Sequence, residues 1–247
     1  MDLKKIILSF GVIAAIFLGS GSICAQTATQ PKLYVVPLQP GETFLKYYEN
    51  NANVHLPPYV ELSADDVNSI ADYLAGVTAY DVKVLDEIIL PDNLLFDEND
   101  LYLYNYDFKS VLENLKDLSG VSANAGSSKF IGVTGLNINR GRFVDGQAEK
   151  VCGQSAIVSV FNDTLRRESG IFKISYLKAE VFKRKIRVTA LHELLHLLCL
   201  EHCQNKGCVM NASDFGHDLL NSYPPLCDDC RKKLGSNGSL IDSDLNY

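Results

Sequence analysis

Two observations predict that this chain forms one α/β domain built around a layered sheet. Short apolar runs, typical of buried strands, alternate with longer stretches that have helical periodicity. The chain has 247 residues, of which 47% are hydrophobic and 21% charged, enough for one core or at most two. A further stretch predicts an almost wholly apolar, buried helix that carries two histidines and a glutamate. The interior of the domain must therefore supply partners for buried polar side chains.

The first 25 residues predict a secretory signal peptide. MDLKK is followed by thirteen mostly apolar residues, 6–18, and then by small polar ones. This apolar run is short for a bilayer, so we expect no stable membrane span. Cleavage after Ala25 would make Gln26 the first residue; a lipoprotein anchored at Cys24 fits less well, because the bulky Ile23 precedes it. We expect an exported protein, periplasmic or extracellular.

After a short leader at 26–32, the predicted domain runs over residues 33–235 and a flexible tail follows at 236–247. Apolar runs predict four strands, at 33–38, 82–90, 130–138 and 155–161. The polar, glycine-containing stretch at 139–153 predicts a turn. Residues 39–62 hold three prolines and few periodic signals, so they predict a loop.

Three stretches have helical periodicity. Ser63 followed by Asp66 predicts a helix start, and apolar side chains from Val67 to Val77 fit one face of that helix. Apolar positions from Phe108 to Leu118 predict a second helix, and residues 183–200 a third. From Glu201 onward there is little regular pattern, so cysteines have to hold the segment together.

The charge of the chain argues against one class of partner. The formal net charge is −7, and the basic runs at 183–187 and 231–233 are short. A nucleic-acid-binding surface normally needs a broad basic face. We therefore expect no nucleic-acid partner. Separately, we expect the protein to be a monomer.

Residues 192–203, HELLHLLCLEHC, predict a zinc site. On a helix, His192 and His196 project from the same face one turn apart and can bind one zinc ion. Glu193 then lies beside the metal, where a general base is needed. His202 can bring a third nitrogen if the helix ends near residue 199. Three protein nitrogens leave one position open for water, as in catalytic zinc sites.

Four cysteines predict a second metal site. Cys203 and Cys208 form a CxxxxC pair, and Cys227 and Cys230 form a CxxC pair. Two such pairs can close a tetrahedral structural zinc site that would stabilise the irregular C-terminal segment. The alternative is two disulfides, which are common in exported proteins.

Together these motifs resemble the archaemetzincins, the archaelysin branch of the metzincin metallopeptidases. The resemblance rests on HELLHLLCLEHC, on CVM and on CDDC, and it extends over about 33–235 to include LYVVPL and SAIVSVF. It implies a single compact metzincin-like domain with a mixed twisted sheet and an active-site helix. The irregular C-terminal segment would be stabilised by zinc.

The resemblance also implies roles for individual residues. It implies two zinc ions per chain, a catalytic one on His192, His196 and His202 and a structural one on Cys203, Cys208, Cys227 and Cys230. Glu193 would be the general base, and Met210 an apolar floor beneath the catalytic metal. SAIVSVF would lie near the cleft, where an extended substrate could pair as an added strand. Tyr176 and His217 are polar and not far away in sequence, but no role follows for them.

Cys199 stands where metzincins normally have glycine. Glycine enters the backbone conformation of this turn easily, whereas a side chain there costs about 1–3 kcal/mol. Three states of Cys199 are open: a small buried thiol, a disulfide with Cys152, and an extra zinc ligand that would compete with water. The sequence alone does not fix the pairing of cysteines.

The function that the sequence predicts is a zinc metallopeptidase acting on peptide or protein substrates. One alternative is a zinc-binding protein of the same fold with weak or no peptidase activity, because Cys199 could displace the third ligand. A zinc-ribbon interaction module is a further alternative. The acidic charge and the predicted export disfavour its usual nucleic-acid partner.

Overall fold

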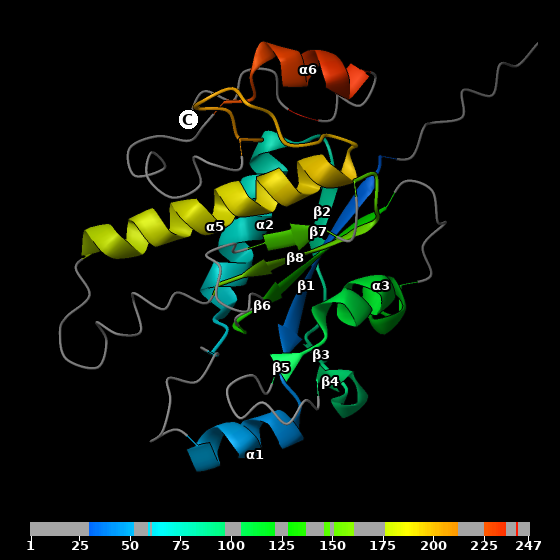
Figure 1. Cartoon of the computed structure of the whole chain (residues 1–247), viewed down its shortest axis with the longest axis vertical. Coiled ribbons are helices and arrows are strands. Elements are labelled where there is room, and N and C mark those ends of the chain that lie inside the picture. Colours follow the sequence, from blue (N-terminus) through cyan, green and yellow to red (C-terminus); the bar gives the residue numbers. More distant parts are fainter. Residues whose placement is uncertain are drawn as a thin grey trace, which may run out of the picture.

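A mixed six-stranded β-sheet forms the middle layer of the molecule (Figure 1). The computed structural model describes residues 30–51, 59, 61–96, 105–121, 128–136, 146–148, 151–160, 176–211, 225–235 and 241. The main strand order is β2-β1-β6-β8-β7, and β3 also pairs with β1. The strands are β1 Lys32–Gln39, β2 Asp81–Val84, β3 Ile88–Ile89, β6 Lys129–Thr134, β7 Gly146–Ala148 and β8 Ser155–Ser159. All pairings are parallel except that of β7, which runs antiparallel to β8 at the edge.

Helices cover both faces of the sheet. The long helix α5, Tyr176–Leu197, and α2, Ala64–Val77, pack on one face. On the other face lie α3, Phe108–Leu118, and side chains of α1, Glu42–Asn51. Helix α6, Asp228–Leu234, is drawn above the C-terminal half of α5 in Figure 1. Small elements complete the fold: the 3₁₀ turn η1, Asp92–Leu94, and the strand pair β4, Leu95–Phe96, and β5, Asn105–Tyr106.

The alternation of side chains along β1 explains these layers. Leu33 and Val35 are buried against α2 and α5, whereas Tyr34 and Val36 are buried on the α3 side. A strand that is covered on both faces reads as a continuous apolar run, which is the pattern of LYVVPL. The predicted α/β domain with a layered sheet is confirmed.

Two predicted helices match closely. In α2 the Ser63 hydroxyl accepts a hydrogen bond from the Asp66 N–H at 3.1 Å, which is the predicted helix start. Helix α3 has the predicted bounds, and Asp107 caps its first turn by accepting a hydrogen bond from the Lys109 N–H. The third predicted helix, 183–200, begins earlier, at Tyr176, and its last helical residue is Leu197.

Four predictions about local structure are wrong. The predicted loop at 39–62 contains α1: Pro40 lies two residues before the helix start at Glu42, where proline does not interrupt helical hydrogen bonds. The predicted strand at 82–90 divides into β2 and β3. The predicted turn at 139–153 contains β7, whose three residues are too few to show periodicity. The segment after residue 201 contains α6, which has acidic residues in its first turn and basic ones in its last.

The ends of the chain are described only in part. The predicted signal peptide lies outside the described residues. Within the predicted tail, Ile241 is described: it is buried and bridges to Thr78.

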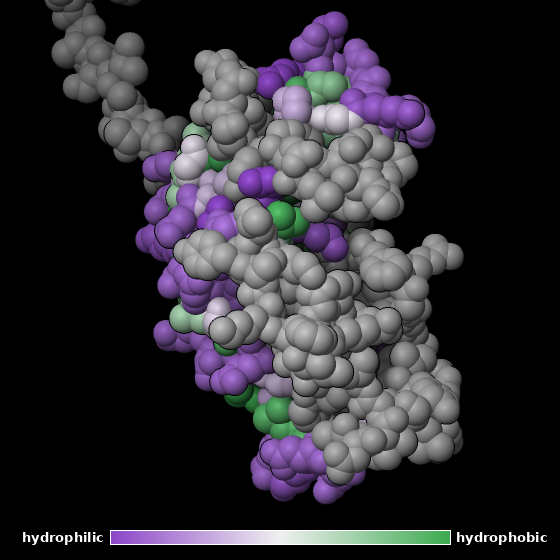
Figure 2. All heavy atoms as spheres, turned by 90° about the vertical axis from the view of Figure 1, so that its left-hand side faces the viewer, coloured by the Kyte–Doolittle hydropathy of each residue, from purple (hydrophilic) through white to green (hydrophobic). Residues whose placement is uncertain are grey.

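Hydrophilic side chains dominate the described part of the face shown in Figure 2. Among the described residues, the exposed large hydrophobic side chains are Val84, Ile89 and Val151. No helix in the described part of the chain is long and apolar enough to cross a membrane.

Candidate active site

The three predicted histidines meet at the C-terminal end of α5. His192 and His196 lie one helical turn apart and are only 5% and 9% exposed, whereas His202 is exposed and arrives from the chain beyond the helix. The Nε2 atoms are 3.0 Å apart between His192 and His196, and each is 3.2 Å from the Nε2 of His202. We call these three residues the histidine triangle.

The histidine triangle has the dimensions of a zinc site. Three nitrogens bound tetrahedrally at 2.0–2.1 Å from one zinc ion lie about 3.3–3.4 Å apart. The observed separations are 3.0–3.2 Å, so a small expansion would accommodate the ion. Three uncharged nitrogens facing one another make no stabilising contact unless a cation or proton lies between them, so the donor set fits zinc.

Backbone carbonyls fix the orientation of the two helical histidines. The Nδ1–H of His192 donates to the Val209 carbonyl at 2.7 Å, and that of His196 donates to the Leu200 carbonyl at 2.7 Å. A carbonyl only accepts, so each Nδ1 carries the proton and each Nε2 offers a lone pair. Burial lowers the pKa of His192 to about 3 and also lowers the pKa of His196. Both imidazoles are therefore neutral at physiological pH, the state that binds a metal.

Glu193 belongs to α5, and its side chain lies against strand β7. It is 4% exposed, and burial raises the pKa of its carboxyl to about 8, although a hydrogen bond from the Ala148 backbone N–H acts in the opposite direction. Such a pKa lies near neutrality, where a group can both take up and release a proton. This buried carboxyl group belongs to the residue that directly follows His192 on α5.

The four predicted cysteines also meet. The Sγ atoms of Cys203, Cys208, Cys227 and Cys230 all lie within 4.8 Å of one another, and we call these residues the four-cysteine cluster. Cys208 and Cys230 have Sγ atoms 3.9 Å apart. Two sulfurs bound tetrahedrally to zinc at 2.3 Å lie about 3.8 Å apart, so the cluster fits this ion. All four are free of disulfides, so the alternative of two disulfides is absent from the structure.

Hydrogen bonds to sulfur favour the thiolate form at one end of the cluster. Burial acts to raise the pKa of Cys227, but hydrogen bonds led by the Asn205 side chain outweigh it and lower that pKa to about 7. The Asn205 Nδ2 donates to the Cys227 Sγ at 3.1 Å. Burial raises the pKa of Cys208 to about 11 and raises the pKa of Cys230. A metal ion is what would allow these buried thiols to ionise.

One short segment of backbone serves both groups of ligands. Cys203 directly follows His202, and its N–H donates to the Met210 carbonyl at 3.0 Å. Cys208 directly precedes Val209, whose carbonyl orients His192. Met210 is fully buried in the core beneath this segment. A displacement of Cys203 therefore displaces His202, and a displacement of Cys208 displaces the Val209 carbonyl that orients His192.

Comparison with known proteins identifies the family. The sequence profile described as Peptidase family M54 matches residues 59–236, which is more than half of the chain. The chain belongs to peptidase family M54. The M54 peptidase is therefore a zinc metallopeptidase that acts on peptide substrates.

Curated relatives of the M54 peptidase include archaeal proteins. Archaemetzincin of Haloarcula marismortui is 26% identical over 182 residues, covering 74% of this chain and 99% of that protein. Archaemetzincin of Methanocaldococcus jannaschii is 34% identical over 146 residues, covering 57% of this chain and 75% of that one. The crystal structure of archaemetzincin from Methanopyrus kandleri has 20% identity and a TM-score of 0.51, covering 84% of this chain and 95% of that chain. It has the same fold.

In the M54 peptidase, Cys199 lies in the turn after Leu197, the last helical residue of α5, and has a left-handed conformation. The φ angle of Cys199 is 73°, the region that favours glycine. The Cys199 N–H donates to the His196 carbonyl at 3.0 Å and the Leu200 N–H to the Leu195 carbonyl at 3.0 Å, the hydrogen bonds of a Schellman turn. This turn redirects the chain so that His202 returns to the histidine triangle.

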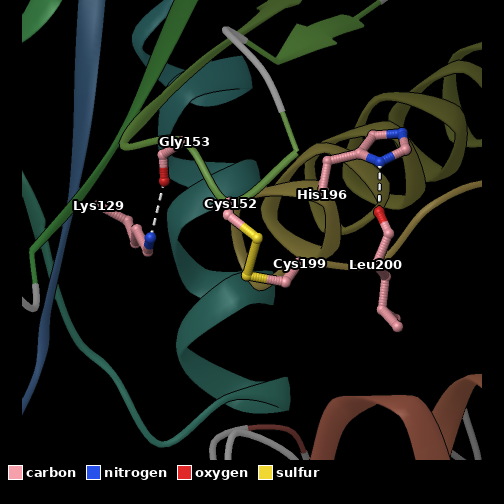
Figure 3. The surroundings of a disulfide bond; sticks show 6 residues. All are labelled: Lys129, Cys152, Gly153, His196, Cys199 and Leu200. Atoms are coloured by element: carbon pink, nitrogen blue, oxygen red, sulfur yellow. Dashed lines mark hydrogen bonds between the residues drawn. A yellow bond between two sulfur atoms is a disulfide. The ribbon is translucent and has the colours of Figure 1, made fainter.

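A disulfide joins Cys199 to Cys152 in the M54 peptidase (Figure 3). Both half-cystines are exposed, and both have positive φ, 63° at Cys152 and 73° at Cys199. The Cys152 N–H also donates to the His196 carbonyl at 2.9 Å. Figure 3 shows that the disulfide connects the turn before β8 to the end of α5. The same turn accepts a hydrogen bond at the Gly153 carbonyl from the Lys129 side chain of β6. The disulfide thus holds the turn in a conformation that glycine adopts more readily.

We expect the identity of residue 199 to decide the stability of variants without the disulfide. Cys152→Ser alone removes a cross-link between residues 47 apart, worth about 4 kcal/mol in chain entropy. In that background, Cys199→Gly should be more stable than Cys199→Ala by about 1 kcal/mol, because alanine is strained at positive φ. Urea unfolding of the zinc-loaded proteins measures the difference. Equal free energies of unfolding would contradict a strained turn.

Some functional groups have no clear signal in the sequence. Neither the Ala148 N–H nor the strand β7 has a recognisable signal in the sequence. Val209 does have one, because in CVM it stands between a candidate metal ligand and a buried methionine. β8 pairs with β6 on one edge and β7 on the other, so the expectation that substrate adds to it is wrong. Tyr176 is the first residue of α5, about 24 Å along the helix axis from His192, and His217 lies outside the described residues.

Proposed function

We propose that the M54 peptidase binds two zinc ions and hydrolyses peptide bonds with Glu193 as general base. The observation that carries this proposal is the meeting of three imidazole Nε2 atoms, 3.0–3.2 Å apart, next to a buried carboxyl group. The histidine triangle would hold the catalytic ion and the four-cysteine cluster the structural one. Met210 would form the apolar floor beneath the histidines.

Each side chain has a defined task in the proposed reaction. The neutral imidazoles hold the metal through Nε2, and the Val209 and Leu200 carbonyls keep the rings of His192 and His196 in orientation. When bound, zinc supplies Lewis-acid chemistry that lowers the pKa of water and polarises a peptide carbonyl. Glu193 takes the proton of the attacking water and passes it to the leaving amine. Its burial keeps that proton from exchanging with solvent.

We also propose that the peptidase is exported after removal of residues 1–25 and acts as a monomer. The disulfide between Cys152 and Cys199 supports export, because disulfides persist in oxidising compartments. The exposed large hydrophobic side chains in the described ranges are limited to Val84, Ile89 and Val151, which supports a monomer. Mass spectrometry of secreted protein would find Gln26 as the first residue, and an unprocessed N-terminus would contradict the proposal.

The proposed function is tested on protein spanning residues 26–247. Diffraction data on both sides of the zinc absorption edge should give two anomalous peaks, one within the histidine triangle and one within the four-cysteine cluster. The same preparation should cleave members of a peptide library, lose this activity to a chelator and regain it with added zinc. A single peak at the cysteines despite added zinc, or full activity without metal, would overturn the proposal.

A further inference from the structure

Glycine at position 146 leaves a space that the side chain of Glu193 fills. Gly146 is buried in β7, directly beside α5. A Cβ atom built on it would lie 2.7 Å from the Glu193 Cγ, 2.9 Å from the Glu193 Oε1 and 2.7 Å from the Thr189 Cγ2. Non-bonded carbon atoms pack at about 3.5–4.0 Å, so even a methyl group would overlap with Glu193.

The backbone of Gly146 gives no other reason for glycine. Its φ angle lies outside the left-handed region, unlike those of Gly120, Gly207 and Gly235. It is paired in register with Val158, in a strand conformation that any residue can adopt. Glycine in a strand often marks a close approach by another group. Here the approaching group is the carboxylate arm of Glu193.

Three neighbours confine the carboxyl group. The β7 backbone at Gly146 lies on one side, and the Thr189 methyl, one helical turn before Glu193, lies on another. The Ala148 N–H, two residues along β7, donates a hydrogen bond to the carboxylate. The Ala148 N–H can donate to the Glu193 carboxylate only while the Glu193 side chain packs directly against β7. This packing requires a residue without a side chain at position 146.

We infer that Gly146 is a positioning residue, which sets the location of the Glu193 carboxylate relative to the reacting water. This inference rests on the proposed function of Glu193 as general base. A methyl group at 146 forces the carboxylate away from the Ala148 N–H and out of line with the histidine triangle. The added methyl group therefore lowers the rate of the chemical step and leaves substrate binding unchanged, because the base acts in the transition state.

The test compares two buried strand glycines in the zinc-loaded enzyme. We expect Gly146→Ala to lower kcat about 10²-fold, with KM within about threefold and zinc content unchanged. The control is Gly132→Ala in β6, where a Cβ would lie 2.7 Å from the Leu38 Cδ1, on the face of the sheet away from α5. It should lower the melting temperature in the same way and leave kcat within about twofold. Equal kcat losses in both variants, or none in Gly146→Ala, would overturn the inference.

A second readout does not depend on activity. Glu193→Ala removes Cγ and Oε1, two of the three atoms that the added methyl would meet, and leaves the Thr189 Cγ2 in place. We therefore expect Gly146→Ala to lower the melting temperature more in the wild-type background than in the Glu193→Ala background. Equal losses in both backgrounds, including failure to fold in both, would overturn the inference. A Glu193→Gln enzyme that still cleaves at the normal rate would instead refute the proposed function.

Discussion

Replacing Glu193 with glutamine is expected to abolish peptide hydrolysis and leave the zinc content of the M54 peptidase unchanged. Glutamine has the same shape, and its amide oxygen can still accept the hydrogen bond from the Ala148 N–H. It cannot take up a proton, and a positioned general base contributes about 10²–10⁴-fold to rate. We therefore expect kcat to fall by at least this range, with the folded structure intact.

The measurement is kcat on a cleavable peptide, together with the zinc content of the same sample. Glu201→Gln is a matched control, because it makes the same chemical change at an exposed carboxylate directly before His202. It should retain most of the activity. Normal cleavage by Glu193→Gln, or an equal loss in Glu201→Gln, would contradict the role of Glu193.

The second large effect is expected from Cys230→Ser, which should weaken zinc binding at both sites. Loss of one thiolate opens the four-cysteine cluster, and structural zinc sites contribute about 10–16 kcal/mol of apparent binding energy in small domains. The damage should reach the histidines, because Cys203 adjoins His202 and Cys208 adjoins Val209, whose carbonyl orients His192. Changes to partners of metal ligands typically cost about 10–100-fold in affinity, and we expect that loss at the histidine triangle.

Zinc titration of metal-free protein, followed by calorimetry, separates the two sites by affinity. Lys232→Ser is the control, because Lys232 is an exposed residue of the same helix, α6, and gives the same new side chain. It should bind two zinc ions, the number proposed for the wild type. If Cys230→Ser lost only its structural zinc, with histidine-site affinity unchanged, the two sites would be independent.

The parts of the fold that follow from local chemistry could be predicted from the sequence. Ser63 and the apolar face from Val67 to Val77 define α2, because helix caps and periodicity depend on neighbouring residues. The spacing of His192 and His196 likewise places both rings on one face of α5. These features need no knowledge of distant contacts.

Features set by distant contacts could not be predicted. The partner of His192 is a carbonyl 17 residues away, and the hydrogen bond on Glu193 comes from β7, which consists of three residues. Helix α1 was hidden by the prolines around it, and its buried Phe44 packs against residues of β1 and α3. The conformation of Cys199 was open because a disulfide partner 47 residues away stabilises it.

The disulfide between Cys152 and Cys199 also changes which part of α5 opens first. Helices ordinarily fray from their ends, and amide hydrogens there exchange fastest with solvent. In this protein the C-terminal end carries His196 and the turn toward His202, and it is the end covalently tied to the strand region. The N-terminal end, near Tyr176, has no such cross-link in the described part of the chain. Fraying is thereby directed away from the histidines that we propose as metal ligands.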